Sequence, residues 1–489
     1  MKKNILYTFL LALALSVSSC LDKYPENAIL ADDAITTIDE ADQAVIGIYS
    51  SFLSGALYSG YLTLLPDIQT DLVYAVNGYT NTYGDIWRWN DILATNSQIE
   101  SVYAALYTVI GRCNFLLDNA ENMRKRMTDD DALDRLDVYC GEAYFARALA
   151  YSELIKQFCK AYESDADAQN ELGVVLRTHY YSDEPIKRAS LYDSYQQVLS
   201  DLELAEKALA LGDDYDIAVD GYMYNFTYFN EYTVCALRAR IALYMKKYDE
   251  AIKYATKVID SGHYFLSSAT QLYDSQYSYY QYMWTSDNST EVIWKIGFTS
   301  TSYGGALGQV FFNYDYNSMK PDYVPAQWVL SLYDSNDLRY STFFQTFTTG
   351  HTHGLTWPLL AKYWGNEGLY NEAQLLHVSM PKVFRLSEQY LIRAEAYVMN
   401  EDFAKAGKDI TTLRKARYST YGGSTALSKD NAMTIVEEER VKELFMEGFR
   451  LMDLKRWHKG FERTPQEQSL ENGSSLVVEK DDPLFVWPI

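Results

Sequence analysis

Apolar and polar residues alternate with a helical period along most of this chain of 489 residues. The clearest stretch is 192–210, where one helix face would carry Leu199, Leu202, Ala205, Ala208 and Leu209. The same period predicts further helices over residues 37–52, 97–123, 131–158, 232–246, 248–261, 387–399 and 403–417. A chain with this pattern is expected to fold as a mostly α-helical protein.

Two of these helices begin with a capping box, in which a hydroxyl residue and a glutamate three positions later satisfy each other's backbone N–H groups. Thr37 and Glu40 form one such box, and Ser97 and Glu100 form another. The two boxes predict where the helices start. Residues 55–96, which lie between them, are rich in Gly, Asn, Tyr and Trp and are expected to be irregular.

Two pairs of adjacent helices, 232–261 and 387–417, have similar sequences. The dipeptide Arg-Ala recurs at 147–148, 238–239 and 393–394. Small residues at facing positions let antiparallel helices approach closely, and recurrent pairs of this kind are typical of repeat proteins. The sequence therefore predicts a scaffold of stacked helical hairpins of the tetratricopeptide type.

The helical pattern stops between residues 262 and 386, which hold the densest aromatic residues together with several Gly and Asn. Loops, short strands and a few short helices are expected there. In a helical scaffold, such an insertion is where ligand-binding residues usually lie. We therefore expect residues 37–489 to form one α-helical domain, with a loop-rich binding insertion at about 262–386.

The stretch 430–457, DNAMTIVEEERVKELFMEGFRLMDLKRW, predicts one long helix that Asp430 caps. Gly448 costs about 1 kcal/mol in a helix interior, and a helix accepts that cost where another backbone comes close. Much charge on so apolar a helix indicates buried, paired ions. Opposite charges lie one turn apart at Arg440 and Glu443, Glu447 and Arg450, and Asp453 and Arg456.

This charged run resembles the C-terminal signature of the SusD/RagB-like outer-membrane nutrient-binding lipoproteins. The matching residues are Glu439-Arg440, Glu443-Leu444, Glu447-Gly448, Arg450, Asp453-Leu454 and Arg456-Trp457. The segment 483–489, PLFVWPI, resembles the closing segment of that family. Further matches, such as residues 195–206, extend the resemblance over nearly the whole mature chain.

The resemblance implies a SusD-like fold, with tetratricopeptide-like helical hairpins and a loop-rich insertion that contains short strands. It also implies a protein without enzymatic activity that captures an oligosaccharide and delivers it to a TonB-dependent outer-membrane transporter. Members of this family bind glycans with aromatic residues from an early loop and from the central insertion. No cofactor is implied.

Residues 1–19 have the features of a lipoprotein signal peptide. Two lysines precede a mostly apolar run that is too short to span a membrane. The segment 17–20, VSSC, resembles a bacterial lipoprotein cleavage site, which implies that Cys20 is acylated. Residues 20–36 would then form a lipidated tether to the outer membrane. The family resemblance implies that the protein faces the cell exterior.

The net charge of −23 argues against nucleic acid, whose phosphates would be repelled, and against attraction to anionic lipid. Four cysteines remain after cleavage, and all lie among apolar residues of predicted helices: Cys113, Cys140, Cys159 and Cys235. We expect buried thiols there, although the spacing leaves a disulfide open. Because there is no Cys/His ligand set, no structural zinc is expected.

Aromatic residues lie among polar residues in two stretches, 74–89 and 273–284, with Tyr303 beyond. Neither stretch keeps a helical or strand period, so two readings stay open: a ligand-binding surface, or packing of the loops onto the scaffold. Tyr and Trp match the flat C–H face of a sugar, whereas amide and charged groups match its hydroxyl edge. The candidate ligand-binding residues are Tyr79, Asn81, Tyr83, Trp87, Trp89, Tyr280, Trp284 and Tyr303.

Other functions stay open at the level of sequence. A glycoside hydrolase would need two carboxylates beside these loops, for which Asp71 and Asp85 are the candidates. A peptide-binding or scaffolding member of the family is a third reading, because helical repeats often hold peptides. His351 and His353 would share one face of a strand, but no third metal ligand is indicated.

Overall fold

The computed structural model describes residues 34–76, 80–181, 183, 185–210, 226–351, 354–464 and 475–489. Helices dominate these residues, which confirms the predicted mostly α-helical fold. The longer helices are α2 Ile38–Ser51, α5 Ser97–Arg126, α6 Asp130–Phe158, α8 Leu191–Leu209, α9 Glu231–Tyr244, α10 Tyr248–Ile259, α16 Leu386–Met399, α17 Phe403–Arg417 and α18 Ala432–Glu443.

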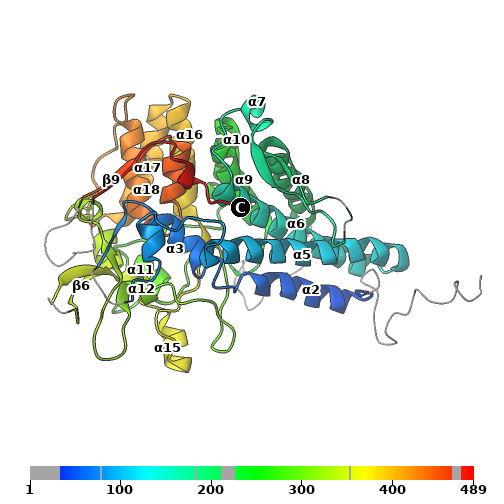
Figure 1. Ribbon diagram of the computed structural model, residues 1–489, viewed down its shortest axis with the longest axis horizontal. Coiled ribbons are helices and arrows are strands. Elements are labelled where there is room, and N and C mark those ends of the chain that lie inside the picture. The colour runs from blue at the N-terminus through cyan, green and yellow to red at the C-terminus, as the bar shows by residue number, and fades with distance from the viewer. Residues whose placement is uncertain are drawn as a thin grey trace, which may run out of the picture.

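Neighbouring long helices pack side by side as hairpins (Figure 1). α6 lies between α5 and α8, α9 packs on α10, and α10 packs on α16, which pairs with α17. Small residues line these contacts: Ala143 and Ala146 of α6 are fully buried, and a side chain at Gly141 would collide with Ala208. The predicted stack of closely packed hairpins is confirmed.

The arginine in two of the three Arg-Ala pairs ties one helix to the next. Arg147 of α6 donates two hydrogen bonds, of 2.8 and 2.7 Å, to the Asp201 carboxylate of α8. Arg393 of α16 makes the same bidentate pair with Asp409 of α17, again at 2.8 and 2.7 Å. Charge-assisted pairs of this geometry are among the strongest in proteins, so the repeated dipeptide fixes helix orientation as well as spacing.

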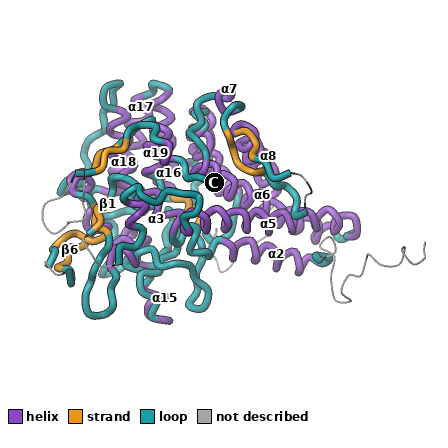
Figure 2. Tube along the Cα trace, viewed as in Figure 1, coloured by secondary structure: helices purple, strands orange, loops and turns teal. Residues whose placement is uncertain are grey.

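Short elements fill the insertion and the ends of the scaffold, as predicted. The strands form two-stranded antiparallel sheets, which Figure 2 shows as short segments among loops. In the insertion, the elements are α11 Tyr279–Thr285, β4 Val292–Lys295, α12 Gln309–Phe312, β5 Tyr323–Pro325, α13 Gln327–Ser331, α14 Arg339–Phe343, β6 Phe344–Thr348, β7 Thr356–Leu360, η4 Ala361–Tyr363, α15 Glu367–Ala373 and β8 Lys382–Arg385. The others are α3 Tyr61–Ile68, β1 Val73–Ala75, α4 Gly84–Trp87, α7 Asp165–Ala168, β2 Leu172–Val175, β3 Arg188–Ser190, α19 Arg450–Arg456, β9 Phe461–Arg463, β10 Leu476–Val478 and η5 Pro483–Phe485.

The predicted single helix over residues 430–457 is wrong. α18 and α19 are separated by a turn in which Gly448 has a left-handed φ of 84°. The turn brings Gly448 against α3, where a Cβ atom would lie 3.1 Å from the carbonyl oxygen of Leu62. The close backbone approach expected at Gly448 is therefore confirmed, but a break in the helix makes it, and glycine is the residue that tolerates such a turn.

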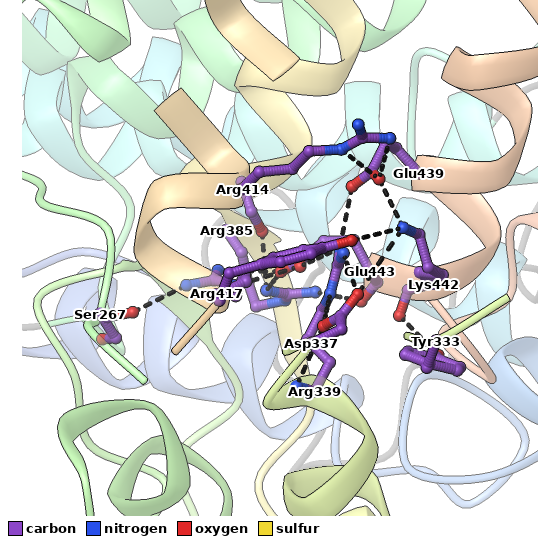
Figure 3. A network of polar contacts seen from close by, with 12 residues as sticks. Ser267, Tyr333, Asp337, Arg339, Arg385, Arg414, Arg417, Glu439, Lys442 and Glu443 are labelled. Atoms are coloured by element: carbon purple, nitrogen blue, oxygen red, sulfur yellow. Dashed lines mark hydrogen bonds and ion pairs between the residues drawn. The ribbon is translucent and has the colours of Figure 1, made fainter. Parts of the chain in front are cut away.

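Several charges of this C-terminal segment are buried and paired, as predicted (Figure 3). The Glu443 carboxylate accepts hydrogen bonds from Arg417, Arg385 and Arg339, with shortest lengths of 2.9, 3.0 and 3.3 Å. Burial alone would raise the pKa of Glu443, but these guanidinium groups hold it well below its ordinary value. Because the partners come from β8, α14 and α17, the cluster joins the insertion to the helical scaffold.

Two of the expected helix starts differ from the prediction. The Thr37–Glu40 capping box is present at α2. At α5, however, Asn96 is the N-cap and accepts the Gln98 and Ile99 N–H groups, so the predicted box at Ser97 is wrong by one residue. Asp430 does not cap α18, which follows Asn431 without a side-chain cap.

Candidate functional site

The early loop and the insertion meet through paired strands. β1 pairs antiparallel with β5, with Tyr74 opposite Val324. The pairing continues past the strand end, because the Val76 N–H group donates to the carbonyl oxygen of Asp322 at 2.8 Å. Two regions that lie about half the chain apart in sequence therefore share one small sheet, and the loop after β1 projects from it.

Asp322 holds the described part of this loop in place. One carboxylate oxygen accepts the backbone N–H groups of Thr80 and Asn81, each at 3.0 Å. The other accepts the Thr80 hydroxyl and, at 3.2 Å, the side-chain amide of Asn313. Asp322 is buried, so a single carboxylate with four donors fixes the loop to the insertion.

The backbone of this loop is strained. Asn81, Tyr83 and Trp89 all adopt left-handed φ angles near 60°, which are rare for residues with a side chain. Gly84 is required between them, because a Cβ atom there would lie 2.1 Å from the Asn81 side-chain oxygen. Strain of this kind clusters at ligand-binding sites, where surrounding contacts over-determine an unfavourable conformation.

A hollow of about 540 Å³ opens beside this loop, within the usual size range of small-molecule sites. Its walls come from the segment between α2 and α3, from α3 itself, one face of α5, the early loop and the insertion. The lining residues are Ser54, Gly55, Ala56, Ser59, Gly60, Tyr61, Leu64, Tyr83, Ser101, Ala104, Gly305 and Ala306.

Close backbone packing forms the boundary of the hollow on the insertion side. The Gly305 N–H group donates to the Ser59 hydroxyl at 2.9 Å. A Cβ atom at Gly304 would lie 2.3 Å from the Ser59 Oγ atom, so no larger residue fits at that position. Tyr303, which directly precedes these glycines, is 45% exposed and lies next in sequence to this contact.

Tyr61 and Tyr83 form the aromatic wall of the hollow. Their rings meet edge to face, with centroids 5.8 Å apart, a favoured arrangement for aromatic pairs. Burial raises the pKa of Tyr83 to about 12, and Tyr61 and Asp322 add to the increase. The Tyr83 hydroxyl, like that of any tyrosine at neutral pH, carries its proton and can donate a hydrogen bond.

Of the predicted ligand-binding residues, only some reach the surface. Tyr83 lines the hollow, Asn81 is exposed beside it, and Tyr303 is exposed on the insertion. Trp89 is half-buried and donates its indole N–H group to the carbonyl oxygen of Gln69 at 2.7 Å. Tyr79 lies outside the described residues.

Trp87, Tyr280 and Trp284 lie in the core, so their assignment to a ligand-contacting surface needs correction. Each is at most 4% exposed. The Trp87 indole donates to the carbonyl oxygen of Val73, and the Arg463 guanidinium stacks on its ring at 4.1 Å. A ligand in solution cannot reach these rings in this arrangement, because loop and scaffold side chains cover them.

Cations also pack on Tyr280 and Trp284, the two buried aromatic residues of α11. Lys362 and Lys382 place their ammonium groups 4.3 and 4.7 Å from the Trp284 ring centre. Arg417 stacks on Tyr280 at 4.0 Å. Buried cations need partners, and the flat faces of these rings supply part of the stabilisation.

The structure also exposes aromatic residues that the sequence analysis missed. Trp364 and Tyr316 are 39% and 55% exposed, and Tyr314 lies between them with ring centres 5.9 and 5.6 Å away. Phe347 stacks on Trp364. The abundance of aromatics in the insertion is the available sequence signal, but it does not separate exposed rings from buried ones.

The carboxylates proposed for a hydrolase are engaged in ion pairs. Asp71 is buried and binds Arg450 through both oxygens, at 2.9 and 2.8 Å, so neither oxygen is open to a substrate. Asp85 is exposed and pairs with Arg88 at 2.8 Å. The His351 Nε2–H group donates to the Pro321 carbonyl oxygen, whereas His353 lies outside the described residues.

The described residues contain no group of three or more His, Cys, Asp or Glu side chains placed to hold a metal ion. No helix in this part of the chain has both the length and the apolar character needed to cross a bilayer.

Comparisons with known proteins agree with this architecture. Residues 352–482 match the family described as the SusD family, and residues 21–243 match the family described as "Starch-binding associating with outer membrane". Together the two matches cover most of the chain. They include the early loop, most of the hairpin scaffold and the charged C-terminal segment.

Similar proteins span almost the same length. The chain is 22% identical to SusD-like protein P25 of Formosa agariphila, over 93% of this chain and 89% of that protein. A SusD superfamily protein from Bacteroides thetaiotaomicron superposes with a TM-score of 0.74 at 23% identity, over 90% of this chain and 94% of that one. A putative sugar binding protein from Bacteroides vulgatus gives a TM-score of 0.74 at 24% identity, over 93% and 95%. The chain belongs to the SusD family.

Proposed function

We propose that this protein is a cell-surface glycan-binding protein, without enzymatic activity, that captures an oligosaccharide in the hollow beside Tyr61 and Tyr83. The observation that carries the proposal is the hollow itself, where a strained aromatic loop and the insertion meet. The description of one matched family as starch-binding, and the sugar-binding title of the Bacteroides vulgatus structure, support it.

The chemistry of the hollow suits a sugar ring. The Tyr61 and Tyr83 rings offer flat apolar faces for the C–H groups of a sugar. Serine hydroxyls and the Tyr83 hydroxyl offer hydrogen bonds to the sugar hydroxyls. Exposed Tyr303 and Asn81 would extend the contact to neighbouring sugar units of a longer chain.

Calorimetric titration with glycans selected from an oligosaccharide array tests this proposal. Tyr83→Ala and Tyr303→Ala should each weaken binding by about 0.5–1.5 kcal/mol, the usual contribution of one aromatic contact. Tyr181→Ala is the matched control, because Tyr181 is 73% exposed and does not line the hollow. If no glycan binds, or if Tyr83→Ala leaves the affinity unchanged, the proposed function is wrong.

Delivery to a transporter is the second part of the proposal. We infer that the captured oligosaccharide passes to a TonB-dependent outer-membrane transporter, and that an acyl chain on Cys20 holds the protein at the exterior face of that membrane. The outer-membrane association in the family description supports this location. Cys20 lies outside the described residues. Cys20→Ala should move the protein out of the membrane fraction, and affinity purification of the native protein should recover the transporter.

A second groove favours the peptide-binding alternative. It measures about 960 Å³ and lies between α6, α7 and the C-terminal segment, with Phe158, Leu172 and Trp487 among its apolar residues. Arg188 lies among them and offers a charged contact. A peptide library screened beside the glycan array separates the two functions, because only a peptide-binding protein should select a peptide sequence.

A further inference from the structure

The hollow beside Tyr61 and Tyr83 has an uncharged lining. Among the described residues that form it, none is Asp, Glu, Lys, Arg or His. Five of the twelve carry hydroxyl groups, and the remaining seven are Gly, Ala or Leu. The hydroxyl residues are Ser54, Ser59, Ser101, Tyr61 and Tyr83.

These hydroxyls act as neutral donors and acceptors. The Ser101 hydroxyl donates to the carbonyl oxygen of Ser97 at 2.6 Å, so its lone pairs remain available to accept. The Tyr83 hydroxyl is protonated at neutral pH, as an ordinary tyrosine is, and burial raises its pKa further, to about 12. A ligand hydroxyl can pair with such groups without bringing a charge into the hollow.

Two charged groups of the early loop and the insertion, Arg88 and Asp322, are already paired. Arg88 donates one hydrogen bond to the Asn81 side chain at 2.9 Å and another to Asp85 at 2.8 Å. The Asp322 carboxylate is occupied by the loop donors described above, and its charge contributes to the raised pKa of Tyr83. No lining cation is therefore present to meet an anionic ligand in the described part of the site.

A carboxylate or sulfate in this hollow would lose water without gaining an ion pair, which is costly. It would also approach a protein with a net charge of −23, whose field repels anions. An uncharged sugar meets neither penalty, and its hydroxyls match the hydroxyl groups of the lining. Its apolar face matches Tyr61 and Tyr83.

We propose that the hollow selects uncharged sugar units and excludes uronic acids and sulfated sugars. This inference rests on the proposed glycan-binding function and names its ligand class. Two observations lead to this ligand class. The lining offers no cation to pair with an anionic sugar, and the net negative charge of the protein repels anions at longer range.

Binding of two oligosaccharide panels to the full mature chain tests the inference. One panel contains neutral gluco-, manno-, galacto- and xylo-oligosaccharides, and the other contains oligogalacturonates, oligomannuronates and sulfated galactans. We expect measurable affinity only in the neutral panel. The affinity should change less than twofold between low and high salt, since no ion pair forms on binding.

A variant that fills the hollow locates the binding site. Ala104 is exposed on α5 and lines the hollow, so Ala104→Trp should place an indole there without disturbing the core. We expect at least a tenfold loss of affinity for the neutral ligand and an unchanged melting temperature. Tyr181→Trp, at an exposed position outside the hollow, should leave the affinity unchanged.

The outcomes separate the two proposals. Preferred binding of uronates or sulfated sugars that Ala104→Trp abolishes would overturn the inference and leave glycan capture intact. Neutral binding that Ala104→Trp does not affect would also overturn it, because the ligand would then lie elsewhere. Failure of every glycan in both panels would overturn the proposed function itself.

Discussion

The carboxylate of Asp67 accepts a 2.9 Å hydrogen bond from the N–H group of Gly448, although 381 positions separate the two residues. Its other oxygen accepts the Arg450 N–H group at 2.8 Å. Asp67 is fully buried in α3, and both donors lie in or beside the turn that separates α18 from α19. One side chain thus fixes the C-terminal turn against the helix that supports the early loop.

Replacing Asp67 should destabilise the protein strongly. Asp67→Ala removes two hydrogen bonds and leaves two buried N–H groups without an acceptor, which predicts a loss of about 3 kcal/mol in the free energy of unfolding. Urea denaturation monitored by tryptophan fluorescence measures it. Asp85→Ala is the control, because Asp85 is exposed and its loss should stay within about 0.5 kcal/mol. Equal losses in both variants would contradict the role given to Asp67.

Glu443→Gln should be among the most destabilising substitutions in the chain. It removes the negative charge that three buried arginines share, and breaking a buried ion pair costs about 3–5 kcal/mol. Glu203→Gln on α8 breaks an exposed pair with Lys207 and should cost less than about 1 kcal/mol. Thermal unfolding by calorimetry compares them. A melting temperature for Glu443→Gln close to that of the control would disprove the structural importance of this cluster.

The ion cluster also predicts sensitivity to acid. Burial alone would raise the pKa of Glu439, but Arg339, Lys442 and Arg414 outweigh it and lower the pKa from 4.5 to about 2. Because the folded state favours the charged form, Glu439 stabilises the protein above pH 4.5, and this contribution disappears as the pH falls toward 2. The difference in unfolding free energy between wild type and Glu439→Gln should therefore shrink between pH 5 and pH 2.5. A difference that stays constant over this range would contradict the pKa shift.

The four described cysteines should be unreactive in the folded protein. All are free and buried, and burial raises the pKa of Cys140 and of Cys159 to about 11. At pH 8 these thiols are protonated and shielded, so a thiol reagent should label none of them until the protein is unfolded. Labelling with and without denaturant, on Cys20→Ala protein, gives the count. Fewer than four thiols after unfolding without reductant would indicate a disulfide that the structure lacks.

Local sequence signals predicted the scaffold well, because helices are set by nearby residues. The 3.6-residue period over 192–210 and the Thr37 capping box depend only on neighbours in the chain, and both led to correct helices. The break in the helix at Gly448 could not be predicted from neighbouring residues. Its N–H partner, Asp67, is distant in sequence, and only the folded structure shows that a turn replaces the expected helix.

The candidate site shows the same limit at the level of single side chains. Tyr83 and Trp87 lie four residues apart in one aromatic loop. From the sequence alone, both are equally good candidates for ligand contact. Left-handed turns and the stacked guanidinium of Arg463 turn Trp87 inward, whereas Tyr83 lines the hollow. Sequence composition located the loop, but tertiary contacts decided which rings reach solvent.

The hydrogen bonds from the early loop to Asp322 reduce the entropy that ligand binding would cost. The Asp322 carboxylate of the insertion already binds the backbone N–H groups of Thr80 and Asn81. The backbone conformations of these two residues are therefore fixed before a ligand binds. The entropy lost on ordering this part of the loop is therefore lost during folding and not during ligand binding. Because binding does not have to order the loop, weak neutral contacts are enough to give measurable affinity.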